Sequence, residues 1–129
     1  MKGVRSLINL EFKGNKPIYE QIIEGIKLNV MRRYLKPGDA IPSVRKLALD
    51  LKITPGTVAK AYQELERQGV IETIRGKGTF IAEKPLIKAD EERLDAVRQK
   101  LKSPIMELKM MGYDKKLLKE FVSSIYDEL

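Results

Sequence analysis

Apolar residues recur every three or four positions along much of the chain, which is the spacing of helices that bury one face. The first stripe begins at Ile18 and returns at every fourth residue as far as Val30. It predicts an amphipathic helix from Pro17 to about Tyr34, since proline suits the first turn of a helix. The turn-forming residues 36–39 follow and should end it.

Two shorter helices are predicted next, close together in the sequence. The first begins at Ser43, and the second begins at Thr54 with Pro55 in its first position and ends at Gly69. Their inward faces are Val44, Leu47, Ala48 and Leu51 in the first helix and Val58, Ala61, Tyr62 and Leu65 in the second. Two short helices joined by a tight turn are typical of a helix-turn-helix.

Extended structure is indicated in three short segments. Residues 7–12 alternate between apolar and polar side chains, which predicts a short extended stretch before the first helix. Residues 70–74 and 79–81 are rich in β-branched and aromatic side chains and flank a glycine-containing turn at 75–78, so they predict a β-hairpin. A helix, a helix-turn-helix and a hairpin, in that order, predict a winged helix-turn-helix.

Beyond Pro85 the helical spacing continues on two more stripes. Pro104 should kink or restart the first helix, with Ser103 as the cap of a restart, Gly112 should end it, and Asp114 should cap the last helix. Two helices alone bury little apolar surface, so we expect the stripes to pack on a second copy of the chain. The predicted dimer interface comprises Leu94, Val97, Leu101, Ile105, Leu108, Leu118, Phe121, Val122 and Ile125.

Composition excludes several kinds of chemistry. The 129 residues contain no cysteine, histidine or tryptophan, which removes disulfides, zinc fingers, thiol nucleophiles and the commonest general base. An enzyme would have to rely on carboxylates, lysine, tyrosine or serine, and the carboxylates are scattered along predicted helix surfaces. We therefore expect a binding protein without a cofactor or metal. The sequence shows neither a secretory signal nor a membrane-spanning apolar run, and we expect a cytoplasmic location.

The net charge of +7 is unevenly distributed. Residues 1–84 hold 16 Lys and Arg against 9 Asp and Glu, a difference of +7, whereas residues 85–129 hold 9 of each. A basic part joined to a neutral part indicates a polyanion-binding module beside a module with another role. Ordinary solubility charge is the alternative that composition alone leaves open.

Candidate nucleic-acid contacts occur at the start of the predicted recognition helix. The small residues Thr54, Gly56 and Thr57 would let the helix start approach a duplex, and free N–H groups there favour phosphate. Thr57 could meet a base edge or a phosphate, and Lys60 a phosphate or a guanine. A well-capped helix with a solvated face is the alternative interpretation.

Two further basic groups flank this helix. Arg45 and Lys46 lie in the first turn of the preceding helix, where the helix dipole disfavours cations unless an anion lies opposite. Residues 75–78, Arg-Gly-Lys-Gly, could place Arg75 and Lys77 in a minor groove of DNA or along its phosphate backbone. They do not form a nucleotide-binding P-loop, because their lysine lies between two glycines and a strand follows. A tight turn with solubilising charges is the alternative.

These motifs, taken in order, resemble a known family. The segments are PIYEQI at 17–22, IPSVRKLA at 41–48, TVAKAYQEL at 57–65, GVI at 69–71 and GKGTFI at 76–81. They closely resemble the DNA-binding domain of GntR-family transcriptional regulators. The first segment and the short helical tail are similar to the YtrA-type branch of that family, whose members carry a small dimerisation region.

The resemblance implies an α+β, mostly helical fold. It divides the chain into an N-terminal extended segment (1–15), a winged helix-turn-helix DNA-binding domain (16–84) and a helical dimerisation region (85–129). DNA contacts carried over from the family fall on Arg45, Pro55, Gly56, Thr57, Arg75 and Gly76. Together with the contacts inferred from the residues, the predicted DNA-binding set is Ser43, Arg45, Lys46, Thr54, Gly56, Thr57, Lys60, Arg75, Gly76 and Lys77.

One departure from the family changes the expected readout. Pro55 stands where many relatives have an arginine, so sequence reading should shift to Thr57, Lys60 and Arg45. The resemblance implies a homodimeric repressor that binds double-stranded DNA at a palindromic operator. A nucleoid-associated or RNA-binding winged-helix protein is the alternative. A small-molecule effector stays open, and its pocket would have to form between subunits or against the DNA-binding domain.

Overall fold

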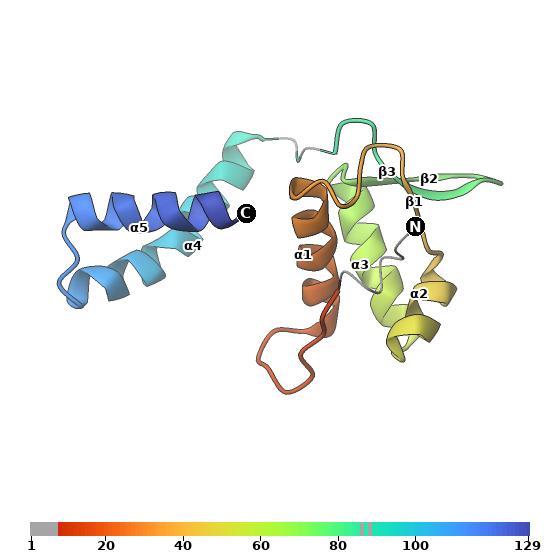
Figure 1. Cartoon of the computed structure of the whole chain (residues 1–129), viewed down its shortest axis with the longest axis horizontal. Coiled ribbons are helices and arrows are strands. Elements are labelled where there is room, and N and C mark those ends of the chain that lie inside the picture. Colours follow the sequence, from red (N-terminus) through yellow and green to blue (C-terminus); the bar gives the residue numbers. More distant parts are fainter. Residues whose placement is uncertain (1–7, 86, 88) are drawn as a thin grey trace. The chain divides into compact units, whose positions relative to one another are not determined.

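A computed structural model describes residues 8–85, 87 and 89–129, which form two compact units, Met1–Lys88 and Ala89–Leu129 (Figure 1). The first seven residues of the predicted N-terminal segment lie outside the described part. The helices and strands of the first unit are α1 (Ile18–Met31), β1 (Ala40–Ile41), α2 (Val44–Leu51), α3 (Pro55–Arg67), β2 (Ile71–Ile74) and β3 (Gly78–Ile81). Those of the second unit are α4 (Glu91–Met110) and α5 (Lys115–Glu128).

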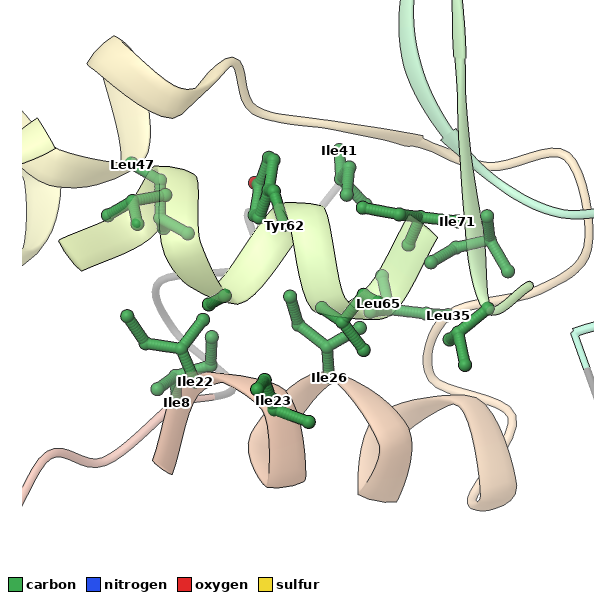
Figure 2. Packing of buried hydrophobic residues seen from close by; sticks show 14 of the residues in the cluster. Ile8, Ile22, Ile23, Ile26, Leu35, Ile41, Leu47, Tyr62, Leu65 and Ile71 are labelled. Carbon is green, nitrogen blue, oxygen red and sulfur yellow. The ribbon is translucent and has the colours of Figure 1, made fainter. Parts of the chain in front are cut away.

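The core of the first unit lies between α1 and α3 (Figure 2). Ile22 and Ile26 of α1 and Val58 and Leu65 of α3 are all 0% exposed. Each fully buried aliphatic side chain of this size contributes about 1.5–3 kcal/mol relative to an exposed one. The apolar stripes that predicted these helices are therefore the faces that hold them together.

A buried tyrosine fixes the helix-turn-helix. The hydroxyl of Tyr62 on α3 donates a hydrogen bond of 2.7 Å to the carbonyl oxygen of Pro42, just before α2. Burial raises the pKa of Tyr62 above its ordinary range, so the hydroxyl keeps the proton that it donates. Ser43 caps α2 as predicted, since its hydroxyl accepts from the backbone N–H of Lys46 at 3.1 Å.

The hairpin belongs to a three-stranded antiparallel sheet in the order β1-β3-β2. The sequence predicted β2 and β3 but missed β1, whose two residues are too short to show alternation. Ile74 pairs with Gly78, and the N–H of Lys77 donates to the carbonyl of Ile74 at 2.9 Å. Gly76 has φ +79° in this turn, a conformation that favours glycine. The turn is thus one residue shorter than predicted, because Gly78 begins β3.

Two predictions before α2 were wrong in detail. Helix α1 ends at Met31 rather than near Tyr34, because Arg33 adopts a left-handed φ of 63° and the N–H of Tyr34 donates back to the carbonyl of Asn29. Among the described residues of the 7–12 segment, none forms a strand. Ile8 packs into the core, whereas Phe12 is 65% exposed, so the alternation reflects one anchoring contact and not a sheet.

In the second unit, α4 continues through Pro104 without a restart, so Ser103 is not a cap. The cap of α4 is Asp90, which accepts from the N–H of Arg93 at 2.7 Å. The predicted cap at Asp114 is confirmed by its 2.8 Å contact with the N–H of Leu117. No described residue of α4 or α5 is buried, and no helix in the described part of the chain is long and apolar enough to cross a membrane.

Candidate nucleic-acid interface

The start of α3 is open rather than capped by a side chain. Thr54 holds the cap position with an extended backbone, but its hydroxyl makes no capping hydrogen bond. Its Oγ1 lies 3.0 Å from Oγ1 of Thr57, and the two hydroxyls satisfy each other. Thr54 therefore occupies the predicted cap position, but its side chain does not cap the helix. Pro55, in the first helical position, has no N–H to offer.

Gly56 has no structural partner that would explain it. A Cβ atom added to this residue would meet nothing within 4 Å in the described structure, and its backbone is not in the left-handed region. Glycine near the start of an exposed helix is less stable than alanine by about 0.5–1 kcal/mol. Packing within the chain does not require this glycine, and the missing side chain leaves the surface at the start of α3 open to a close approach.

The two cations at the start of α2 differ in their contacts. Both Arg45 and Lys46 are exposed in the first turn of the helix. Lys46 forms an ion pair with Asp50, with Nζ and Oδ1 3.1 Å apart. Arg45 makes no hydrogen bond or ion pair with any residue that the structure describes. Its guanidinium, with five N–H donors, is free to bind an external acceptor.

The hairpin tip carries a second unpaired group of cations. Arg75, Gly76 and Lys77 are all exposed in the turn between β2 and β3, and neither cation has a partner in the described part of the chain. In Figure 1 the hairpin and α2 both lie on the side of α3 that faces away from α1. The predicted contacts on α2, α3 and the hairpin thus come from three neighbouring elements of one unit.

Lys60 has a contact that the sequence did not predict. Its Nζ lies 3.9 Å from the centre of the Tyr19 ring, which belongs to the first turn of α1. The two residues are far apart in the chain, so no local spacing could have revealed the pair. Lys60 is exposed, but its ammonium is held against α1 and does not extend freely from α3.

A carboxylate on the exposed side of α3 is neutralised internally. Glu64 accepts hydrogen bonds from Arg67, with Nε at 2.9 Å, and from Gln68 at 2.7 Å. The hydrogen bond from Arg67, followed by that from Gln68, lowers the pKa of Glu64 to about 2. Its charge is compensated at neutral pH, so Lys60 keeps the net positive charge of this face of the helix.

A cleft of about 480 Å³ lies in the first unit between residues 8–16 and α1, and it is lined largely by polar side chains. The structure describes no group of three or more acidic side chains that could bind a metal ion. The exposed groups of the unit are instead hydrogen-bond donors: the side chains of unpaired cations and the backbone N–H groups at the open start of α3. Such a set suits binding to the phosphate backbone and base edges of a nucleic acid.

Sequence comparison decides the family. A family model described as "Bacterial regulatory proteins, gntR family" matches residues 18–81. The chain is also 40% identical over 119 residues to the HTH-type transcriptional repressor YtrA of Bacillus subtilis, covering 92% of each protein. The chain belongs to the gntR family of bacterial regulatory proteins. It is thus a DNA-binding transcription regulator with a winged helix-turn-helix, and not an enzyme, as the sequence predicted.

Solved structures agree with this gntR-family assignment. A protein from Listeria monocytogenes EGD-e, described as a transcriptional antiterminator, is 39% identical and superposes with a TM-score of 0.80, covering 92% of this chain and 88% of that one. The DNA-binding domain of AraR in complex with operator ORX1 is 28% identical with a TM-score of 0.53. That match covers 58% of this chain and 96% of the AraR chain. A related domain thus binds operator DNA.

Proposed function

We propose that this gntR-family regulator is a homodimeric repressor that binds a palindromic operator through two winged helix-turn-helix domains. The observation that carries the proposal is the pairing of an open α3 start, at Gly56, with the unpaired cations Arg45, Arg75 and Lys77 on the elements beside it. The domain boundaries that we propose are 16–84 for DNA binding and 85–129 for dimerisation.

The roles of the contact residues follow from their surroundings. Arg45 has a free guanidinium that can hold O6 and N7 of a guanine with two parallel hydrogen bonds. Lys77, a flexible point charge at the hairpin tip, suits a phosphate. Lys46 would have to exchange Asp50 for DNA, and the two threonines would have to break their mutual contact. We therefore assign base reading first to Arg45.

Dimerisation is supported by the exposure of the second unit. Leu94, Val97, Leu101 and Ile105 of α4 are 59%, 51%, 50% and 38% exposed. On α5, Phe121, Val122 and Ile125 are 40%, 53% and 43% exposed, while Leu108 and Leu118 are half-buried. An apolar surface of this kind on a water-soluble chain marks an interaction site. A second copy of the same helices would cover it with matching apolar surface.

A palindromic operator follows from such a dimer. Closed dimers have two-fold symmetry, so their two recognition helices meet two half-sites related by the same symmetry. Repression is proposed from the similarity to YtrA, which is named a transcriptional repressor. Because the target is DNA, we place the protein in the cytoplasm. An effector stays a prediction, with the cleft beside α1 as one place that has room for it.

A binding experiment tests the operator proposal. A duplex selected by the full-length protein from a random DNA library is compared with a scrambled duplex and with an RNA of the same sequence. We expect preference for the selected DNA and a two-fold repeat in it. Log K should fall linearly with log salt by about 0.9 for each neutralised phosphate. Equal binding to selected and scrambled DNA would indicate a nucleoid-type protein, and preference for RNA would overturn the proposal.

A further inference from the structure

We propose that Tyr19 and Lys60 together form a phosphate contact at the junction of α1 and α3. Lys60 would bind the phosphate, and Tyr19 would act as a positioning residue that holds its ammonium in place. The inference rests on the proposed operator binding. It adds a functional residue on α1, outside the helix-turn-helix and the hairpin that carry the other contacts.

The ring of Tyr19 is itself held by the folded unit. Tyr19 is half-buried in the first turn of α1 and packs against the hydrophobic core. Its hydroxyl donates a hydrogen bond of 3.3 Å to Oε1 of Glu20. The ring face is therefore presented to α3 by core packing, and the ammonium of Lys60 lies 3.9 Å from its centre. This is the geometry of a cation–π contact.

The contact leaves the charge of Lys60 available. An aromatic ring attracts a cation without neutralising it, and the N–H groups that point away from the ring can still donate to a phosphate oxygen. The carboxylate one helical turn further along α3, Glu64, is bound by Arg67 and Gln68. Within the described residues Lys60 forms no ion pair, in contrast to Lys46 with its partner Asp50.

Holding the lysine in place changes both its affinity and its selectivity. A free lysine side chain loses rotamer freedom when it binds, and a side chain already held by a ring loses less. The ammonium lies over the Tyr19 ring of α1. We expect the ammonium of Lys60 in this position to contact the phosphate backbone of the DNA, which strengthens binding to every DNA sequence alike.

Full-length variants test the pair on a DNA duplex selected by the wild-type protein and on a scrambled duplex. Lys60→Met should weaken both about equally and lower the salt slope by about two per dimer. Tyr19→Leu, which removes the ring, should weaken both by about 5- to 30-fold for two subunits. Tyr19→Phe keeps the ring and should bind within about twofold of wild type. In the Lys60→Met background, Tyr19→Leu should add nothing.

Two controls separate a positioning role from a merely structural one. Thermal unfolding shows whether Tyr19→Leu folds. If it does not, proton NMR of the wild-type protein still tests the contact, because the ring should shift the ε-methylene protons of Lys60 upfield. An unshifted resonance would overturn the positioning role, as would an equal loss from Tyr19→Leu with and without Lys60.

Other outcomes distinguish this inference from the proposed function. If Lys60→Met weakens only the selected duplex, Lys60 reads a base and the phosphate role is wrong. If the wild-type protein selects DNA and Lys60→Met binds it equally well, only the present inference fails. If the wild-type protein binds no duplex, the proposed function fails first.

Discussion

At the residue scale, function depends on which charged groups already have a partner. Arg67 and Lys46 are engaged with carboxylates of their own helices, at Glu64 and Asp50 respectively. Arg45 and Lys77 have no such partner in the described structure. Surface ion pairs contribute little to stability, so the paired cations stabilise the fold only slightly. The unpaired cations form no ion pair and add no stability of this kind. In the proposed function these unpaired cations bind DNA, and two substitutions can separate their roles.

Replacing Arg45 with alanine should weaken binding to the selected duplex by about 1–3 kcal/mol and relax the preference at one base pair in each half-site. Lys77→Ala should instead weaken all sequences nearly equally and reduce the salt slope by about two per dimer. Affinity measurements on selected and scrambled duplexes at two salt concentrations distinguish them. Lys100→Ala, an exposed lysine on α4, is the matched control and should leave both affinities unchanged. An equal loss on both duplexes in Arg45→Ala would make Arg45 a backbone contact.

The lowered pKa of Glu64 predicts a pH dependence of stability. A carboxyl whose pKa in the folded state is about 2, below its ordinary value of 4.5, stabilises the fold above about pH 4.5, and this contribution is lost as the pH falls toward 2. Because the side chain is partly exposed, the effect should not exceed about 1 kcal/mol. Glu64→Gln should therefore show a shallower loss of stability in urea unfolding over this range. Glu72→Gln, at an exposed carboxylate without an ion pair in the described structure, should behave like wild type.

At the element scale, the start of α3 combines an unused cap hydroxyl and a destabilising glycine with an open surface. The hydroxyl of its cap residue Thr54 contacts Thr57, its first residue is proline, and its second is a glycine whose added Cβ would meet no described atom within 4 Å. The proline suits this position, but the glycine weakens the helix start and the threonine hydroxyl adds no capping hydrogen bond. The missing side chain leaves the surface at the start of α3 open, which suits close approach to a duplex. Stability and binding should therefore respond to Gly56 in opposite directions.

Gly56→Ala should raise the free energy of unfolding by about 0.5–1 kcal/mol, because alanine favours the helix and its Cβ would meet no atom of the described residues within 4 Å. The same methyl group should weaken binding to the selected duplex. Chemical unfolding and affinity measurements on one preparation test whether stability rises while DNA affinity falls. Gly76→Ala is an instructive comparison, since its φ of +79° should make that substitution destabilising. Unchanged DNA binding in Gly56→Ala would show that the open surface is not at the contact.

At the scale of the whole molecule, the two units have opposite balances of buried and exposed apolar surface. The buried hydrophobic residues of the described structure all lie in the first unit, between Ile8 and Ile81. The second unit has well-defined helices and caps but no buried residue. Helices that bury no residue gain little stability from tertiary packing, so a partner surface would stabilise the second unit. In the proposed dimer, a second copy supplies it.

A charged substitution in the exposed stripe should separate the proposed dimer. Leu101→Asp places a carboxylate in the middle of α4, where an apolar partner surface could not solvate it, so we expect a monomer in analytical ultracentrifugation. Binding to the selected duplex should weaken strongly, because two linked half-sites bind far more tightly than one. Gln99→Asp, which lies on the opposite side of α4 by helical spacing, should stay dimeric. A dimer that survives Leu101→Asp would place the interface elsewhere.

Much of the fold follows from local sequence patterns. The stripes of α1, α2 and α3 match their buried faces, because helix periodicity and burial are set by residues within a few positions of one another. The caps at Ser43 and Asp114 are local for the same reason. The charge asymmetry and the motifs from residue 17 to residue 81 were enough to predict a gntR-family DNA-binding domain, which the comparisons confirm.

Only the tertiary structure decided which groups are paired across distant parts of the chain. The bond from Tyr62 to Pro42, the pairing of β1 with β3 and the Lys60–Tyr19 contact join residues that local spacing cannot relate. The sequence likewise could not tell that the hydroxyl of Thr54 contacts Thr57 instead of capping α3. Periodicity reports which face of an element is apolar, but the partner of a polar or charged side chain is set by packing between elements. For this reason the sequence determined the family and the basic surface, and the fold decided which cations of that surface are free to bind.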